Sequence, residues 1–295
     1  MSAMFASVAA LVSQGDRVVA SPAMFSSCYV VLTEILPKWG IQVEIVENNE
    51  PETWERALST PAKAVFIETP SNPLLEIVDI SMVAEFAHRA GAQLIVDNVM
   101  ASPVMQKPLE LGADVVMYSA TKHIDGQGRV LGGAILGSRE YIKTKVMPFA
   151  RHTGPSMSAF NAWVLLKSLE TMTMRVERMN ENALKVAEFL SKQKGIKLVS
   201  YPHLKSHKGY ALAKKQMGGG GSTVAFAIDG DKLRKISHAF TRKRGSSYYQ
   251  LHVSLGDKLR SNILCYYQSR EPLCVHTTHC IRTNQSLRQF FHLLE

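Results

Sequence analysis

The chain has 295 residues, of which 46% are apolar and 20% are charged, and this apolar content is enough to bury one large core or two smaller ones. No apolar run approaches the ~20 residues that a membrane-spanning helix requires, so we expect no membrane partner. An apolar stretch near the start lacks the basic residues that open a signal peptide. The four cysteines lack the spacing of a disulfide framework. These features favour a cytoplasmic protein.

Strand and helix patterns alternate along the first half of the chain. Apolar residues at helical spacing over 3–13 predict a core helix, which Gly15 ends. Runs of apolar and β-branched residues predict strands. The expected strands are 16–20, 42–46, 63–68, 93–97, 114–118 and 133–137, and the expected helices among them are 27–38 and 81–90. This alternation predicts a mainly parallel sheet that is covered on both faces.

A different pattern begins at Pro155. Residues 158–193 carry apolar side chains at helical spacing and predict one long helix; these side chains are Trp163, Leu166, Leu169, Val176 and Met179. Further on, four glycines at 218–221 predict a loop before a strand at 222–228, too far from a strand-to-helix turn to hold a phosphate. We therefore expect a large domain over 1–154, and over 155–295 a bridging helix with a smaller C-terminal domain.

Lys122 lies in the most informative stretch, Ser119-Ala-Thr-Lys-His-Ile-Asp-Gly-Gln-Gly-Arg-Val-Leu-Gly-Gly133. An expected strand leads into it, the hydroxyls of Ser119 and Thr121 precede the lysine, and a glycine-rich loop follows. A lysine at a strand end, beside hydroxyls that can bind an anion, is what a cofactor bound through a Schiff base requires. Burial would lower the pKa of this lysine and favour the nucleophilic amine. Taken alone, the motif also fits a surface lysine in a polar loop.

Two expected strands upstream also end in polar residues. One ends at Asp97, and the other runs into a proline-rich loop that contains Asn72. Because the carboxyl ends of parallel strands form one edge of a sheet, these residues should meet Lys122 there. Pyridoxal 5'-phosphate chemistry requires a lysine for the Schiff base, a carboxylate that keeps the pyridine nitrogen protonated, and donors for the phosphate. The combination therefore predicts a site for pyridoxal 5'-phosphate.

Three motifs, Glu68-Thr-Pro-Ser-Asn-Pro73, Val96-Asp-Asn98 and residues 118–133, closely resemble those of the cystathionine γ-synthase family, the pyridoxal-phosphate enzymes of cysteine and methionine metabolism. The resemblance extends from Met1 to about Phe226, and within the family the chain looks most like the O-succinylhomoserine sulfhydrylases. It implies an α/β fold: an aspartate-aminotransferase-like (fold type I) large domain with a mainly parallel sheet, and a smaller α+β C-terminal domain.

The resemblance also assigns roles to residues of the motifs. Lys122 would be the Schiff-base lysine, and Asp97 would be the partner of the pyridine nitrogen. Asn72 would lie beside the phenolic oxygen of the cofactor ring. Ser119 and Thr121 would bind the phosphate.

Two positions near the start match the family with departures. Phe25 falls where the family stacks an aromatic residue on the cofactor ring, but Ser26 replaces the glycine that usually follows. Met1 is the methionine of a Ser-Gly-Met phrase whose glycine would approach the cofactor phosphate. We therefore expect a chain that is truncated at its N-terminus and lacks the arm that reaches into a neighbouring subunit. Family enzymes are homo-oligomers, dimers or tetramers, which is what the resemblance implies here.

The activity that the resemblance implies is γ-replacement on an amino-acid substrate. An O-acylhomoserine, by closest resemblance O-succinylhomoserine, would exchange its γ-substituent for sulfide or a thiol in methionine or homocysteine biosynthesis. A γ- or β-lyase of the same family is an alternative, because the choice of acceptor is not legible in the sequence. A degenerate, non-catalytic fragment is another, because the expected N-terminal arm is missing and the tail does not resemble the family.

The tail over 231–295 differs from the rest in charge, with 11 Lys and Arg against 4 Asp and Glu, a net +7 of the chain's +9. A basic run at 241–244 with tyrosines nearby would suit nucleic acid, but no RNA-binding signature frames it, and we expect no nucleic-acid partner. Residues 274–280 hold two cysteines and two histidines without the separated pairs of a structural zinc site, and we expect no metal.

Two fragments of the tail are candidates for substrate binding. His252-Val-Ser-Leu-Gly-Asp257 resembles the family's Ser-Leu-Gly turn, whose serine, here Ser254, lies near the substrate carboxylate. Arg282 stands in the order of the chain where the family has an arginine that binds this carboxylate in a bidentate pair. The residues on either side of Arg282 do not match the family.

Overall fold

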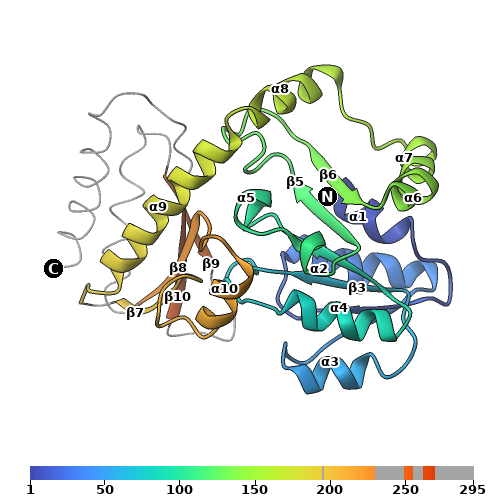
Figure 1. The fold of residues 1–295 in the computed structure, drawn as a ribbon, viewed down its shortest axis with the longest axis horizontal. Helices are drawn as coiled ribbons and strands as arrows, with labels where there is room; N and C mark the ends of the chain where they lie inside the picture. The colour runs from blue at the N-terminus through green and yellow to red at the C-terminus, as the bar shows by residue number, and fades with distance from the viewer. Residues whose placement is uncertain (195, 230–248, 255–261, 270–295) are drawn as a thin grey trace.

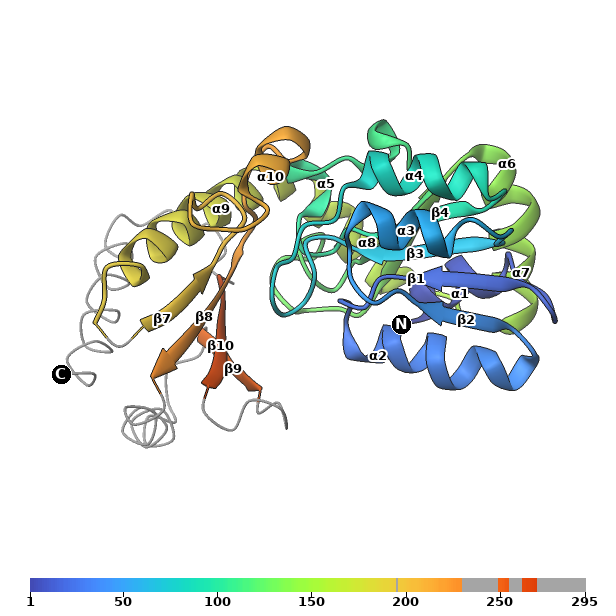
Figure 2. The ribbon, with the colours of Figure 1, turned by 90° about the horizontal axis from the view of Figure 1, so that it is seen from below.

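The computed structural model describes residues 1–194, 196–229, 249–254 and 262–269. This part of the chain forms two sheets that lie side by side in both views (Figures 1 and 2). The first sheet has six strands in the order β2-β1-β3-β4-β5-β6, and the second has four in the order β7-β8-β10-β9.

The first sheet is mainly parallel, as predicted. Its strands are β1 (Arg17–Ala20), β2 (Gln42–Ile45), β3 (Ala64–Glu68), β4 (Gln93–Asp97), β5 (Val115–Ser119) and β6 (Gly133–Gly137). The first five run parallel, and β6 pairs antiparallel with β5. The register places Glu68 opposite Asp97, and Asp97 opposite Met117. The chain therefore leaves β1, β3, β4 and β5 at one shared edge.

Helices cover both faces of this sheet (Figure 2). The helices of this first unit are α1 (Ser2–Ala9), α2 (Ser26–Val30), the π-helical η1 (Val31–Ile35) and 3₁₀-helical η2 (Leu36–Trp39), α3 (Pro51–Ala57), α4 (Ile80–Arg89), α5 (Ser102–Met105), η3 (Pro108–Leu111), α6 (Arg139–Tyr141), η4 (Ile142–Val146) and α7 (Met147–Thr153). In β3, Val65 and Ile67 pack in one core with α3 and α4, whereas Phe66 packs in the other with α1 and α2. A strand that is buried on both faces is apolar throughout, which explains the continuous runs in the sequence.

The single long helix predicted over 158–193 is wrong. The chain forms two helices, α8 (Ala159–Leu169) and α9 (Met172–Leu190), and Thr171 between them leaves helical geometry with φ −113° and ψ 4°. Apolar side chains recur on both sides of the break, but they do not form one buried face. Trp163 of α8 is 57% exposed, whereas Val176 and Met179 of α9 are buried.

The second sheet is antiparallel and carries its own core. Its elements are β7 (Ile196–Ser200), α10 (Tyr210–Gln216), β8 (Thr223–Asp229), β9 (Tyr249–Ser254) and β10 (Asn262–Ser269). Helix α9 packs on β7 and β8 through Val186 and Leu190, which contact Val199 and Phe226. The predicted smaller α+β unit is confirmed, and the glycines at 218–221 form the loop that enters β8.

The two cores support our proposal that a first domain ends near residue 154 and that helix α8 bridges to the second. Val164 and Leu165 of α8 pack on Ala120 and Val130, at the Lys122 loop of the first unit. No helix in the described part of the chain is long and apolar enough to cross a membrane.

Candidate active site

Four strands deliver the predicted site residues to the same edge of the first sheet. Phe25 follows β1, Asn72 follows β3, Asp97 ends β4, and Ser119 ends β5 three residues before Lys122. These are carboxyl ends of parallel strands, where ligands bind in open α/β sheets. The expectation that Asn72, Asp97 and Lys122 share one edge is confirmed.

Asp97 is a buried carboxylate with one oxygen held by the backbone. Its side chain Oδ1 accepts the Val99 N–H at 3.0 Å, and the residue is 5% exposed. Burial raises the pKa of Asp97 to about 7, although the Val99 hydrogen bond opposes the rise. A carboxylate has a second oxygen that can accept a further hydrogen bond. A cationic N–H donor at this oxygen would favour the ionised form.

Lys122 begins a tight turn at the end of β5. Its N–H donates to the Ser119 carbonyl at 3.0 Å, and its own carbonyl accepts the Gly126 N–H at 2.7 Å. The Thr121 hydroxyl oxygen accepts the Gly132 N–H at 3.1 Å, which joins the turn to the start of β6. The turn carries the Lys122 side chain beyond the strand end to an exposed position.

A buried histidine and a buried arginine hold the Lys122 loop from behind. The His123 ring lies between the Val99 carbonyl, 3.0 Å from Nδ1, and the Ser222 hydroxyl, 2.7 Å from Nε2. Burial lowers the pKa of His123 to about 4, so the ring is neutral at pH 7. Arg175 of α9 donates to the carbonyls of His123 at 3.0 Å and Ile124 at 3.1 Å. The loop is thereby tied to the second unit.

Helix α1 begins beside the same turn. Met1 is its N-terminal cap residue, and its carbonyl accepts the Phe5 N–H at 2.9 Å. Gly133 allows α1 to approach, because a Cβ atom at this position would lie 2.6 Å from that of Ala3. Gly133 pairs in register with Ser119. The helix N-terminus, a favourable place for phosphate, therefore lies close to the hydroxyl residues predicted to bind one.

The two predicted substrate residues belong to the last part of the chain, of which the structure describes little. Ser254 ends β9, in the second sheet, where its backbone pairs with Leu264. Arg282 lies outside the described residues, as do the basic run at 241–244 and the cysteine and histidine segment at 274–280. Among the residues that the structure describes, no three His, Cys, Asp or Glu side chains gather where they could hold a metal ion.

Besides His123, three further buried polar residues of the site were not predicted from the sequence. Glu68 is 2% exposed and lies opposite Asp97. The Asn98 amide, fully buried, donates to the Ser102 carbonyl at 3.1 Å and to the Tyr118 hydroxyl at 2.9 Å. Arg175 is 3% exposed. The available signal for Glu68 was its place as the last residue of an apolar strand, which it shares with Asp97.

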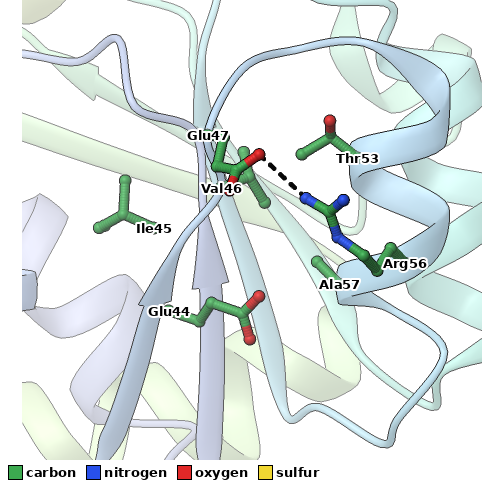
Figure 3. A pocket seen from close by; sticks show the side chains of 7 residues that line it. All are labelled: Glu44, Ile45, Val46, Glu47, Thr53, Arg56 and Ala57. Carbon is green, nitrogen blue, oxygen red and sulfur yellow. Dashed lines mark hydrogen bonds and ion pairs between the residues drawn. The ribbon is translucent and has the colours of Figure 1, made fainter.

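A separate hollow lies beside the edge strand β2 (Figure 3). It is lined by Glu44, Ile45, Val46, Glu47, Thr53, Arg56 and Ala57. Arg56 pairs with Glu47 at 3.1 Å, with side chains that are 68% and 77% exposed. A solvated ion pair of this kind stabilises little and holds no group in place. None of the predicted site residues lines the hollow.

Comparison with known proteins identifies the family. The profile of the Cys/Met metabolism PLP-dependent enzymes matches residues 1–265. The chain belongs to this family. Over 229 residues it is 57% identical to the O-succinylhomoserine sulfhydrylase of Mycobacterium tuberculosis (strain CDC 1551 / Oshkosh), a match that covers 78% of the chain and 56% of the relative. The L-methionine gamma-lyase of Porphyromonas gingivalis (strain ATCC BAA-308 / W83) is 37% identical, with 83% and 61% covered.

Solved structures share the fold. The crystal structure of metB from Corynebacterium glutamicum superimposes with a TM-score of 0.85 at 26% identity, covering 100% of this chain and 78% of that one. The cystathione gamma lyase CalE6 from Micromonospora echinospora gives 0.81 at 30% identity, with 92% and 75% covered. The predicted fold type I architecture is confirmed. The chain spans between half and two thirds of the length of the curated relatives named above.

The residues at the sheet edge fit pyridoxal phosphate. The set contains an amine on Lys122, a desolvated carboxylate on Asp97 and hydroxyls on Ser119 and Thr121. These groups match the aldehyde, the pyridine nitrogen and the phosphate of the cofactor respectively. Phe25, which is predicted to stack on the cofactor ring, is 42% exposed.

The raised pKa of Asp97 predicts a pH-dependent stability for the cofactor-free chain. The folded protein holds this proton up to about pH 7, whereas the unfolded chain releases it near 3.8. The unfolded chain binds fewer protons between these values, so the free energy of unfolding should fall as the pH rises, by roughly 1.4 kcal/mol per unit at most. His123 acts in the opposite sense below pH 6.5, because its pKa is lowered.

Urea unfolding from pH 5 to 8 of the wild type and of Asp97→Asn, which cannot titrate at this position, separates these effects. We expect the advantage of the variant to grow with pH up to about 7 and then to level off. Parallel curves for the two proteins would contradict a raised pKa at Asp97.

Proposed function

We propose that this chain carries a pyridoxal-phosphate site that catalyses γ-replacement on an O-acylhomoserine, with sulfide or a thiol as the acceptor. The observation that carries the proposal is the convergence of Lys122, Asp97 and Asn72 at the carboxyl edge of the first sheet. Its substrate class follows from O-succinylhomoserine sulfhydrylases that are 57% and 45% identical to the chain. The product would be homocysteine or a thioether, which is the basis for a role in methionine biosynthesis.

Each residue at the edge has a defined task in this proposal. Asp97 holds a proton at the pyridine nitrogen, because a buried carboxylate favours an adjacent cation. Asn72 donates to the phenolic oxygen. Ser119 and Thr121 bind the phosphate, together with backbone N–H groups near Met1.

The aromatic ring of Phe25 stacks on the ring of the cofactor, which supplies an electron sink when bound. Lys122 holds the cofactor in the resting state. With the cofactor bound, Lys122 would also move protons at the α and β carbons of the substrate. In the same proposal Ser254 and Arg282 bind the substrate carboxylate.

A γ-lyase is the alternative reaction, and specific relatives favour it. The L-methionine gamma-lyase of Porphyromonas gingivalis is 37% identical to the chain, and the cystathionine gamma-lyase of Bacillus subtilis (strain 168) is 35% identical. Both reactions would use the same residues at the sheet edge. In γ-replacement, sulfide or a thiol adds to the substrate, whereas a lyase releases ammonia and an oxoacid. Product analysis therefore separates the two reactions.

We further propose that the chain forms a homo-oligomer through an exposed apolar face, the α8 face, made of Leu131, Phe160, Trp163 and Leu166. These side chains are 76%, 66%, 57% and 62% exposed. The rings of Phe160 and Trp163 lie 6.2 Å apart, and the Asn161 amide ties the Leu131 carbonyl to α8 at 3.1 Å. A contiguous apolar face of this kind marks an interaction surface. A cytoplasmic location completes the proposal, because the cysteines show no disulfide framework.

The reaction is tested by incubating the chain and pyridoxal phosphate with O-succinylhomoserine, with and without sulfide. We expect homocysteine and succinate only when sulfide is present. Lys122→Ala should lower the rate by roughly 10³-fold or more, because it removes both the covalent anchor and the proton carrier. Lys107→Ala, which alters an exposed ion pair with Glu110, is the matched control and should retain the rate. Release of ammonia and an oxoacid without sulfide would favour the lyase, and no turnover would refute both.

The oligomer is tested by sedimentation of Trp163→Glu, which places a charge at the centre of the α8 face. We expect the wild type to sediment as a dimer or tetramer and the variant as a monomer. Leu109→Glu, at an apolar position that is 44% exposed on η3, should leave the assembly intact. A monomeric wild type would contradict the assignment of the α8 face.

A further inference from the structure

Glu68 is a buried carboxylate to which the proposed chemistry gives no task. It ends β3, is 2% exposed, and lies opposite Asp97 in the register of β3 and β4. Two carboxylates side by side in a desolvated place repel each other when both are ionised. A buried carboxylate is retained at such a position when its oxygens are hydrogen-bonded.

Both oxygens of Glu68 accept backbone N–H groups from outside β3. Oε1 accepts the Asn72 N–H at 2.8 Å, and Oε2 accepts the Phe25 N–H at 2.5 Å. Phe25 and Asn72 belong to two different segments, one after β1 and one after β3. A single side chain therefore connects both segments to the edge of the sheet.

These two hydrogen bonds also govern the charge of Glu68. Burial raises its pKa well above the usual value, and the neighbouring Asp97 raises it further. The N–H groups of Phe25 and Asn72 oppose both effects and favour the ionised form. If Glu68 were protonated, one of its two oxygens would become a hydroxyl donor, although in the structure both oxygens accept an N–H group. The hydrogen bonds from Phe25 and Asn72 therefore offset part of the rise in the pKa of Glu68.

The residues that Glu68 holds are two of those proposed to contact the cofactor. Phe25 is the N-terminal cap residue of α2, so fixing its N–H sets the point from which its ring projects. Asn72 precedes Pro73 in a loop that contains two prolines. The hydrogen bond from its N–H to Glu68 fixes the backbone from which the Asn72 amide side chain projects. One segment presents a ring face and the other presents an amide.

We propose that Glu68 is a positioning residue that sets the Phe25 ring and the Asn72 amide against the cofactor by holding both backbones to the sheet edge. Its importance for catalysis rests on the proposed function, whereas its hold on the two backbones does not. Glu68 contacts neither the substrate nor the cofactor in this proposal.

The first test is amide hydrogen exchange at Phe25 and Asn72 in the full chain without cofactor. In Glu68→Gln one oxygen remains an acceptor, and an NH₂ group faces the other N–H. We expect exchange at one or both amides to rise about tenfold, as loss of a buried hydrogen bond implies. The control is Asp114→Asn, which alters a carboxylate that accepts the Leu94 N–H at 2.7 Å at the opposite edge of the sheet. Unchanged exchange in a folded Glu68→Gln protein would overturn the proposal.

The second test separates positioning from a structural role. Pyridoxal phosphate is titrated into the wild type and both variants, and the visible absorption band of the bound cofactor is recorded. We expect Glu68→Gln to weaken binding about tenfold and to change the band, whereas Asp114→Asn should bind with the wild-type band. Faster exchange with unaltered affinity and band would overturn the positioning role.

Two further outcomes are distinguishable. A wild type that binds no pyridoxal phosphate would refute the proposed function, while the exchange data would still decide whether Glu68 holds the two segments. If Glu68→Gln does not fold, Glu68→Asp replaces it, because it keeps the charge but is one methylene shorter and cannot reach both N–H groups. Wild-type exchange at both amides in Glu68→Asp would overturn the proposal.

Discussion

The parallel register of β3, β4 and β5 is the constraint on which the candidate site depends. It places Glu68 opposite Asp97, and Asp97 opposite Met117, so that the three strands end together. The apolar runs before these ends are buried on both faces of the sheet. The carboxylates are thus held in a desolvated place by packing that does not involve them. Their raised pKa values follow from this position.

A second set of contacts links the Lys122 turn to the rest of the chain. His123 lies between the Val99 carbonyl of the first unit and the Ser222 hydroxyl near the start of β8. Arg175 of α9 binds carbonyls just beyond Lys122. The position of the proposed catalytic lysine is therefore fixed from both units, although the lysine side chain itself is exposed.

Much of this arrangement could be predicted from the sequence because a doubly covered parallel sheet leaves a strong pattern. The strands at 93–97 and 133–137 lie where the apolar runs indicated. The break at Thr171 could not be predicted in the same way, because apolar side chains recur at helical spacing on both sides of it. The roles of Glu68 and Arg175 depend on backbone groups that are distant in the chain and that only the folded structure brings near.

We propose that the carboxyl edge of the first sheet binds pyridoxal phosphate through Lys122. Borohydride reduction of the chain after incubation with pyridoxal phosphate, followed by peptide mapping, tests this claim most directly. We expect reduction to fix the cofactor on the peptide that contains Lys122. Label scattered over surface lysines, or no label at all, would contradict it.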